Sequence, residues 1–227
     1  LQERYHPLGK PIFTNIHVNL EAFPVYLVSD VPGIESSQYR DEDSMFFYRA
    51  ASYHKPLLLL NFVNLHGLDQ RDLAELYHLN AAQWGQFPST GRFVQQAYKD
   101  YGDVTHAYME SIKELSLAGW EPCPLAEGAR LERFGTSGAV YFTLRAPQQA
   151  ATETVHIDAA AVRSLGDDLV AYDAVRLSPV PIAREADGGC SLTMTHGGGL
   201  LTILRLSARE AVAPWLLQRA RQHALYA

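Results

Sequence analysis

Apolar runs and amphipathic helical patterns alternate along the first half of the chain. The runs at 23–29 and 57–63 are apolar on both faces instead of alternating with polar residues. Such runs are typical of strands that are buried on both sides in a parallel sheet. Turn-forming residues follow the first run from Asp30 onward, which predicts a polar loop there.

Helical periodicity fills the intervals between these runs. Apolar side chains recur at steps of three and four residues in three segments: 41–54, 70–84 and 104–118. Asp103 is the predicted N-cap of the last helix, and Gly119 is its predicted end. A further strand is predicted over 120–125, where prolines restrict it to a sheet edge or a strand end. This order predicts a parallel α/β sheet, open or closed into a barrel, although only about three strands are visible.

The second half has the pattern of short strands separated by glycine, proline and aspartate turns. The expected strands are 130–134, 139–144, 152–157, 169–175, 191–195 and 200–206. Their spacing is typical of an antiparallel β-sandwich. The segment 192–204, with three glycines at its centre, predicts a hairpin. The tail at 208–226 has helical composition, and Pro214 must begin or interrupt its regular part.

Charge and aromatic content divide the chain in the same way. Residues 1–126 carry 9 basic and 15 acidic side chains, whereas residues 127–227 carry 10 of each. Of the 24 aromatic residues, 18 precede residue 127. We therefore expect an α/β segment over 1–126 and an all-β segment with a helical tail over 127–227.

The composition also limits the classes of partner. Lys and Arg total 19 against 25 Asp and Glu, a net charge of −6, which argues against a nucleic-acid partner. The longest apolar run, 56–60, is far too short to cross a bilayer, so no membrane partner is expected. No phosphate-binding glycine loop or zinc-ligand spacing occurs, so neither a cofactor nor a metal is expected. The two cysteines, Cys123 and Cys190, are expected to be buried thiols and not a disulfide. Nothing in the sequence assigns a compartment.

Polar side chains follow each predicted strand of the first segment. Since ligands gather at the carboxyl ends of parallel strands, these residues are the candidate site. The first strand end supplies two carboxylates, the second supplies two amides, and a third region, the predicted strand at 120–125, supplies an indole and a carboxylate. In order, they are Asp30 and Glu35, Asn61 and Asn64, and Trp120 and Glu121.

This mixture of side chains suits a sugar. Hydroxyl groups bind to carboxylates and amides, and a pyranose face packs on an aromatic ring. Asp30 and Glu35 are the predicted catalytic carboxylates, acting as acid and base or as acid and nucleophile in glycoside cleavage. The other four residues are predicted to bind substrate. The alternative for each is structural: Asp30 as a turn residue, Glu35 at a helix entry, and Asn61 as a buried amide that needs partners.

Three short segments resemble a known junction. They read Leu-Ala-Gly-Trp-Glu-Pro-Cys-Pro-Leu-Ala at 117–126, Leu-Glu-Arg-Phe-Gly at 131–135 and Val-Tyr-Phe-Thr-Leu-Arg at 140–145. This is similar to the junction in multidomain glycoside hydrolases, where a (β/α)8 barrel leads into a C-terminal antiparallel β-sandwich. The resemblance implies that 1–126 is the closing part of a barrel, completed by another chain, another copy or a longer precursor. It also implies hydrolysis of a glycosidic bond.

Two other functions stay open at this point. The first alternative is a non-catalytic carbohydrate-binding or assembly subunit. The second is an unrelated small α/β enzyme with a β extension. Oligosaccharide binding without turnover distinguishes the first alternative, and a self-sufficient closed sheet distinguishes the second.

Overall fold

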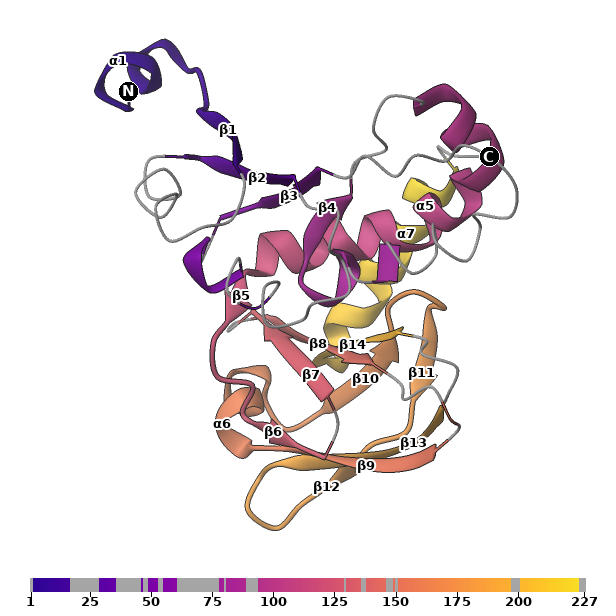
Figure 1. The fold of residues 1–227 in the computed structure, drawn as a ribbon. Coiled ribbons are helices and arrows are strands. Elements are labelled where there is room, and N and C mark those ends of the chain that lie inside the picture. Colours follow the sequence, from indigo (N-terminus) through magenta and orange to yellow (C-terminus); the bar gives the residue numbers. More distant parts are fainter. Residues whose placement is uncertain are drawn as a thin grey trace. The chain divides into compact units, whose positions relative to one another are not determined.

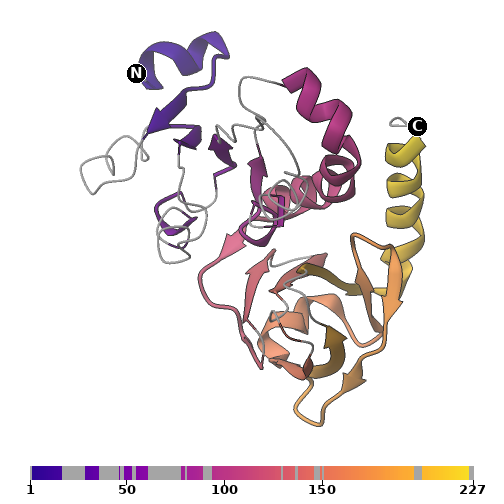
Figure 2. The same cartoon turned by 45° about the vertical axis from the view of Figure 1, so that its right-hand side comes forward.

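The chain forms two compact units, which divide between Gly119 and Trp120 (Figures 1 and 2). We call them the N-terminal unit and the C-terminal unit and describe each by itself. The computed structural model describes residues 2–16, 29–35, 46, 49–52, 55–60, 78–79, 81–88, 94–128, 130–135, 138–145, 149, 151–196 and 201–224. The boundary that composition predicts near residue 126 stays a prediction.

A four-stranded parallel sheet forms the centre of the N-terminal unit. Its strands are β1 (Phe13–Ile16), β2 (Val31–Glu35), β3 (Leu57–Leu60) and β4 (Gln86–Pro88), which lie in that order. Each strand pairs in parallel with the next one. A short helix, α1 (Gln2–Tyr5), and a 3-10 turn, η1 (His6–Leu8), precede β1. The parallel α/β prediction is therefore confirmed for the sheet.

Strand β2 corrects the predicted loop after Asp30. Pro32 and Gly33 suggested a turn, but both lie inside β2, between β1 and β3. The pairing of Gly33 with Asn15 on one side and Leu58 on the other shows that long-range pairing overrides the local turn preference. The apolar run at 23–28 lies outside the described residues. Strands β1 and β4 were not predicted, because each is too short to show a period.

The helices follow the predicted positions in part. The structure describes the predicted helices at 41–54 and 70–84 only in part. Within them, residues 49–51, 78–79 and 81–83 are helical. Helix α5 (Val94–Ala118) begins nine residues before its predicted cap, so Asp103 lies inside the helix. Its predicted end is confirmed: Gly119 has a φ of 86°, and its N–H donates to the carbonyl of Leu115 at 3.0 Å.

Two antiparallel sheets make up the C-terminal unit. The six-stranded sheet has the order β11-β10-β14-β8-β7-β5, and the four-stranded sheet has the order β12-β13-β9-β6. The strands of the first are β5 (Trp120–Glu121), β7 (Arg130–Phe134), β8 (Ala139–Arg145), β10 (Leu169–Asp173), β11 (Ser178–Val180) and β14 (Leu201–Ala208). Those of the second are β6 (Ala126–Glu127), β9 (Ala151–Ile157), β12 (Ala183–Arg184) and β13 (Cys190–His196). Six of these strands confirm the six that the sequence predicts.

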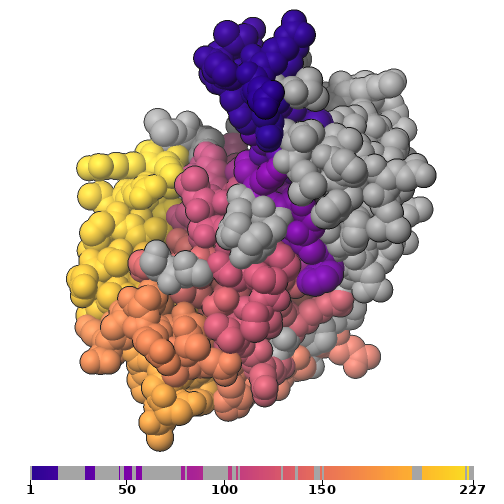
Figure 3. All heavy atoms as spheres, turned by 90° about the vertical axis from the view of Figure 1, so that its left-hand side faces the viewer, coloured from indigo at the N-terminus to yellow at the C-terminus, as the bar shows by residue number. Residues whose placement is uncertain are grey.

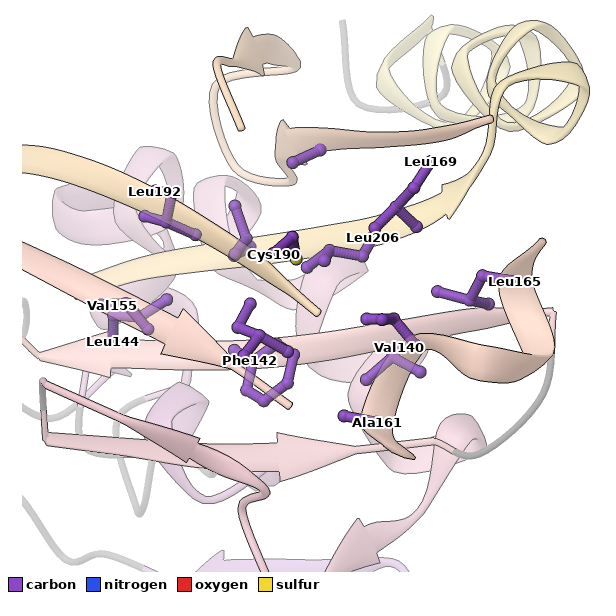
Figure 4. Close-up of a cluster of buried hydrophobic side chains, with 14 residues drawn as sticks. Val140, Phe142, Leu144, Val155, Ala161, Leu165, Leu169, Cys190, Leu192 and Leu206 are labelled. Atoms are coloured by element: carbon purple, nitrogen blue, oxygen red, sulfur yellow. The ribbon is translucent and has the colours of Figure 1, made fainter. Parts of the chain in front are cut away.

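Both sheets contribute to one apolar core (Figure 4). Phe142 on β8 and Leu206 on β14 come from the six-stranded sheet, and Val155 on β9 and Leu192 on β13 come from the four-stranded sheet. Helix α6 (Ala159–Val162) and the turn η4 (Arg163–Leu165) add buried apolar side chains. Burial of this cluster is the main source of stability for the unit.

Two local predictions in this unit are wrong. Strands β13 and β14 do not form the hairpin predicted at 192–204, because β13 pairs with β9 and β12 whereas β14 pairs with β10 and β8. The strand at 120–125 is also not part of the parallel sheet. Only Trp120–Glu121 is extended, and it pairs antiparallel with β7 as the edge of the six-stranded sheet. A local turn or strand signal carries no information about the partner strand.

The C-terminal tail is helical, as predicted. A 3-10 turn, η5 (Arg209–Ala211), leads into α7 (Val212–Ala224), with Pro214 in the first turn, where a missing N–H costs nothing. Trp215 lies under the Arg205 guanidinium at 4.6 Å and meets Tyr172 edge-on at 5.8 Å. The buried Arg219 donates to the Ala174 carbonyl at 2.8 Å. These contacts fix α7 to the six-stranded sheet.

Both cysteines are free thiols, which confirms that no disulfide links them. Cys190 is buried, and burial raises the pKa of its thiol to about 11. Cys123 is exposed, contrary to the expectation that both are buried. Its neighbours Pro122 and Pro124 hold it outside a strand. In the part of the chain that the structure describes, no helix is long and apolar enough to span a membrane.

Candidate functional site

The parallel sheet has two distinct edges, because all four strands run in the same direction. The carboxyl edge is formed by the last residue of each strand: Ile16, Glu35, Leu60 and Pro88. The amino edge is formed by the first residues: Phe13, Val31, Leu57 and Gln86. In parallel α/β folds, ligands bind at the carboxyl edge, while the amino edge mainly serves stability.

Glu35 lies at the carboxyl edge. It is the last residue of β2 and pairs in register with Leu60, the last residue of β3. Asn61 follows Leu60 directly in the sequence. Asn61 and Asn64 lie outside the described residues. Glu35 thus lies at the edge where a ligand is expected in a parallel α/β sheet.

Asp30 lies at the opposite edge. It precedes β2, and its backbone N–H donates to the Ile12 carbonyl at 2.8 Å. One oxygen of the Asp30 carboxylate, Oδ2, accepts a hydrogen bond from the Ile12 N–H at 2.6 Å. The same oxygen also contacts His6 Nε2 at 2.8 Å. These contacts connect β2 to the segment before β1, which lies at the surface (indigo in Figure 3).

The structure does not bring the two predicted catalytic carboxylates together. Five residues of extended chain separate Asp30 from Glu35, a backbone distance of roughly 16 Å. The paired carboxyl groups of glycosidases are about 5 to 9.5 Å apart. The catalytic roles of both residues stay predictions; Glu35 lies at the carboxyl edge and Asp30 does not.

The pKa of Asp30 lies below its usual value. The main cause is the hydrogen bond from the Ile12 backbone N–H, followed by the hydrogen bond with His6; both stabilise the charged carboxylate. A carboxyl group with a lowered pKa in the folded state contributes stability above its unfolded pKa. That contribution is lost as the pH falls through the folded value.

We therefore expect Asp30→Asn to be less stable than the parent near neutral pH, with a difference that disappears in acid. Thermal unfolding followed by circular dichroism between about pH 7 and about pH 2 measures this difference. At the acidic end of this range the Asp30 carboxyl group is protonated, so both proteins carry an uncharged group at position 30. A difference that stays constant over the whole pH range would contradict the role assigned to the carboxylate charge.

Two cationic side chains at the amino edge donate to backbone carbonyls. Lys55 Nζ donates to the Ser29 carbonyl at 2.7 Å. The buried Arg49 donates to the carbonyls of Lys55 at 2.6 Å, Ser52 at 3.1 Å and Trp84 at 3.3 Å. No local sequence pattern marks these residues, because their partners are set by the tertiary fold. Their function here is to hold the starts of the strands together.

Trp120 and Glu121 lie in the C-terminal unit. The Trp120 side chain is buried, and its indole N–H donates to Glu132 Oε2 at 2.7 Å. Glu121 lies 3.6 Å from the Arg133 guanidinium on the neighbouring strand β7. Both side chains thus interact within the six-stranded sheet, and their predicted roles in sugar binding stay predictions. Among the described residues, no group of three or more His, Cys, Asp or Glu side chains is placed to hold a metal.

Comparison with solved structures shows a fold like that of part of a glycoside hydrolase. A variant of a GH27 β-L-arabinopyranosidase from Geobacillus stearothermophilus, in complex with arabinose, superposes with a TM-score of 0.53 at 10% identity. The match covers 91% of this chain and 52% of that enzyme, so the chain spans about half the enzyme's length. At this identity, the similarity concerns the fold alone.

A second similar structure is endo-glycoceramidase II from Rhodococcus sp., bound to a five-membered iminocyclitol. It has 10% identity over 78% of this chain and 43% of that chain. Its TM-score of 0.26 is too low to support a structural argument. No family model matches the chain. No curated protein matches it either.

Proposed function

We propose that this chain is part of a carbohydrate-active protein that hydrolyses a glycosidic bond at the carboxyl edge of its parallel sheet. The observation that carries the proposal is the position of Glu35, the last residue of β2, on a fold like that of a glycoside hydrolase. In the proposed arrangement, the parallel sheet is part of a (β/α)8 barrel. The two antiparallel sheets with their shared core form a β-sandwich.

Glu35 is the proposed carboxylate at the scissile bond. A glutamate there can act as the general acid that protonates the leaving oxygen, or as the second carboxylate of the pair. The separation of the two carboxyl groups decides whether that second carboxylate activates a water or attacks the anomeric carbon. Asn61 and Asn64 are proposed to bind sugar hydroxyls, since they follow the neighbouring strand. The contacts of Asp30 with Ile12 and His6 favour a structural role for that carboxylate. A substrate-binding role for Trp120 and Glu121 requires that substrate reaches the edge of the six-stranded sheet.

A panel of aryl glycosides incubated with the purified chain tests the proposal. Release of the aryl alcohol from at least one sugar, above the rate of a boiled sample, is the expected result. Absence of turnover over the whole panel, and on oligosaccharides, would contradict hydrolysis.

Binding without turnover is the second candidate function. One observation favours it: among the four strand ends that form the carboxyl edge, Glu35 is the one carboxylate. Glycoside cleavage usually needs two such groups. Calorimetric titration with oligosaccharides that are recovered intact would support this reading.

A further inference from the structure

The four-stranded sheet of the C-terminal unit has one face in the core and one face in solvent. Along β9 and β13, alternate residues such as Val155 and Leu192 are buried in the shared core. The residues between them point to the opposite face. That face carries five hydroxyl side chains and one imidazole: Thr152, Thr154, His156, Ser191, Thr193 and Thr195. Figure 1 shows this sheet on the side of the unit away from α7.

We call these six residues the hydroxyl strip. All of them are exposed except Ser191, which is half-buried. Exposed surface normally carries many Lys, Arg, Asp and Glu side chains, but none of the six residues is one of these. Depletion of charged side chains is typical of the central part of a contact surface. The composition of the strip therefore indicates a place where something binds.

Cross-strand hydrogen bonds hold the threonine hydroxyls in place. Thr152 Oγ1 lies 2.9 Å from Thr195 Oγ1, and Thr154 Oγ1 lies 3.2 Å from Thr193 Oγ1. In each pair one hydroxyl donates to the other, and the accepting hydroxyl keeps its own proton for another acceptor. Successive pairs are two residues apart, which is roughly 7 Å along the strands. The strip thus presents fixed donors and acceptors at regular intervals.

The third row of the strip consists of His156 and Ser191, which pair in register. His156 Nδ1 lies 2.8 Å from Oε1 of Glu185, in the turn that joins β12 to β13. Since a carboxylate can only accept, Nδ1 carries the proton, and Nε2 of the neutral ring is an acceptor. The His156 side chain is 56% exposed, so a ligand can reach this nitrogen. On its other side, His156 pairs in register with the exposed Glu127.

We propose that the hydroxyl strip is a second carbohydrate site, which binds an uncharged oligosaccharide. Hydroxyl and imidazole groups match the donors and acceptors of sugar hydroxyls, and the flanking carboxylates of Glu127 and Glu185 accept from them. These carboxylates, and the lack of Lys and Arg in the strip, argue against a nucleic acid or an acidic sugar. The strip also holds no Tyr, Trp, Phe, Met or Arg, the residues that anchor protein partners. The choice of a sugar among polyhydroxy compounds rests on the proposed function.

Affinity electrophoresis of the full chain, in gels that contain a soluble polysaccharide, tests the site. The panel consists of xylan, arabinan, galactomannan and mixed-linkage β-glucan, and at least one is expected to retard the parent. Thr154→Val/Thr193→Val should raise the Kd for that polysaccharide about tenfold, because two hydroxyls are lost while β-branched side chains are kept in the strands. Thr152→Val/Thr195→Val, in the next row, should also weaken binding, so the test does not depend on a single variant.

Ser178→Ala is the matched control. It also removes an exposed hydroxyl from the C-terminal unit, but Ser178 lies on β11 in the six-stranded sheet, so the Kd should equal that of the parent. Absence of retardation over the whole panel would overturn the proposal. Full binding by both threonine variants, or an equal loss in Ser178→Ala, would overturn it as well, because the bound polysaccharide would then lie elsewhere.

A second copy of the chain is the alternative occupant. Sedimentation of the parent and the threonine variants over a range of concentrations detects it. Self-association that both threonine variants abolish, without retardation by any polysaccharide, would assign the strip to a second copy and overturn the carbohydrate site.

The second site and the proposed hydrolysis fail in different ways. Turnover of an aryl glycoside without retardation by any polysaccharide would remove the second site and leave hydrolysis standing. Retardation that the threonine variants lose, without turnover of any glycoside, would leave the second site standing and remove hydrolysis.

Discussion

Phe142→Ala is expected to destabilise the C-terminal unit by about 3–5 kcal/mol, one of the two largest effects that the structure predicts. The Phe142 side chain is fully buried on β8, within the cluster to which both antiparallel sheets contribute (Figure 4). Removing the ring costs its transfer free energy and leaves a cavity that side chains from two sheets line. Chemical unfolding followed by circular dichroism measures the loss.

Leu217→Ala is the control for this substitution. It also truncates an apolar side chain in the C-terminal unit, but Leu217 is 54% exposed, so the expected change stays within about 0.5 kcal/mol. Equal losses in the two variants would show that the cluster around Phe142 is not the core of this unit.

Gly128→Ala is expected to cost about 2–5 kcal/mol, from backbone strain and steric overlap together. Gly128 has a φ of 112°, which side chains rarely allow. A Cβ built there would lie 2.1 Å from the Thr154 carbonyl oxygen on β9. The obstacle is backbone in a central strand, so it cannot move aside without breaking the pairing of the four-stranded sheet.

Gly138→Ala separates the two contributions. Gly138 also has a positive φ, 76°, but no atom lies within 4 Å of a Cβ built there. Its substitution should cost only the strain, about 1–2 kcal/mol. If both alanine variants unfold at the same denaturant concentration, the close approach of Gly128 to β9 is not what limits that position.

Prediction from sequence succeeds where the determinants are local. Strand β7 has the predicted bounds, because its apolar residues sit between glycine-containing turns. Helix α5 ends at Gly119 because glycine readily adopts the left-handed conformation. Pro214 is tolerated in α7 for a reason that is equally local: it stands in the first turn.

Prediction fails where the partner lies far along the chain. Pro32 and Gly33 favour a turn by themselves, yet pairing with β1 and β3 makes them part of a strand. Asp30 was expected to follow a strand over 23–29, of which residues 23–28 lie outside the described residues; in the structure it precedes β2. The contacts of Asp30 come from 18 and 24 residues away, so no local pattern can reveal them. Glu35 was placed near a strand end for the wrong reason, since β2 itself was not predicted.

The account depends on the carboxyl edge of the parallel sheet being the reactive end. Steady-state hydrolysis of the best aryl glycoside by Glu35→Gln and Asp30→Asn, each compared with the parent, tests this most directly. Glu35→Gln should lower kcat/KM about 100- to 10,000-fold, and Asp30→Asn should lower it far less. Full activity in both variants, or equal losses in both, would contradict the account.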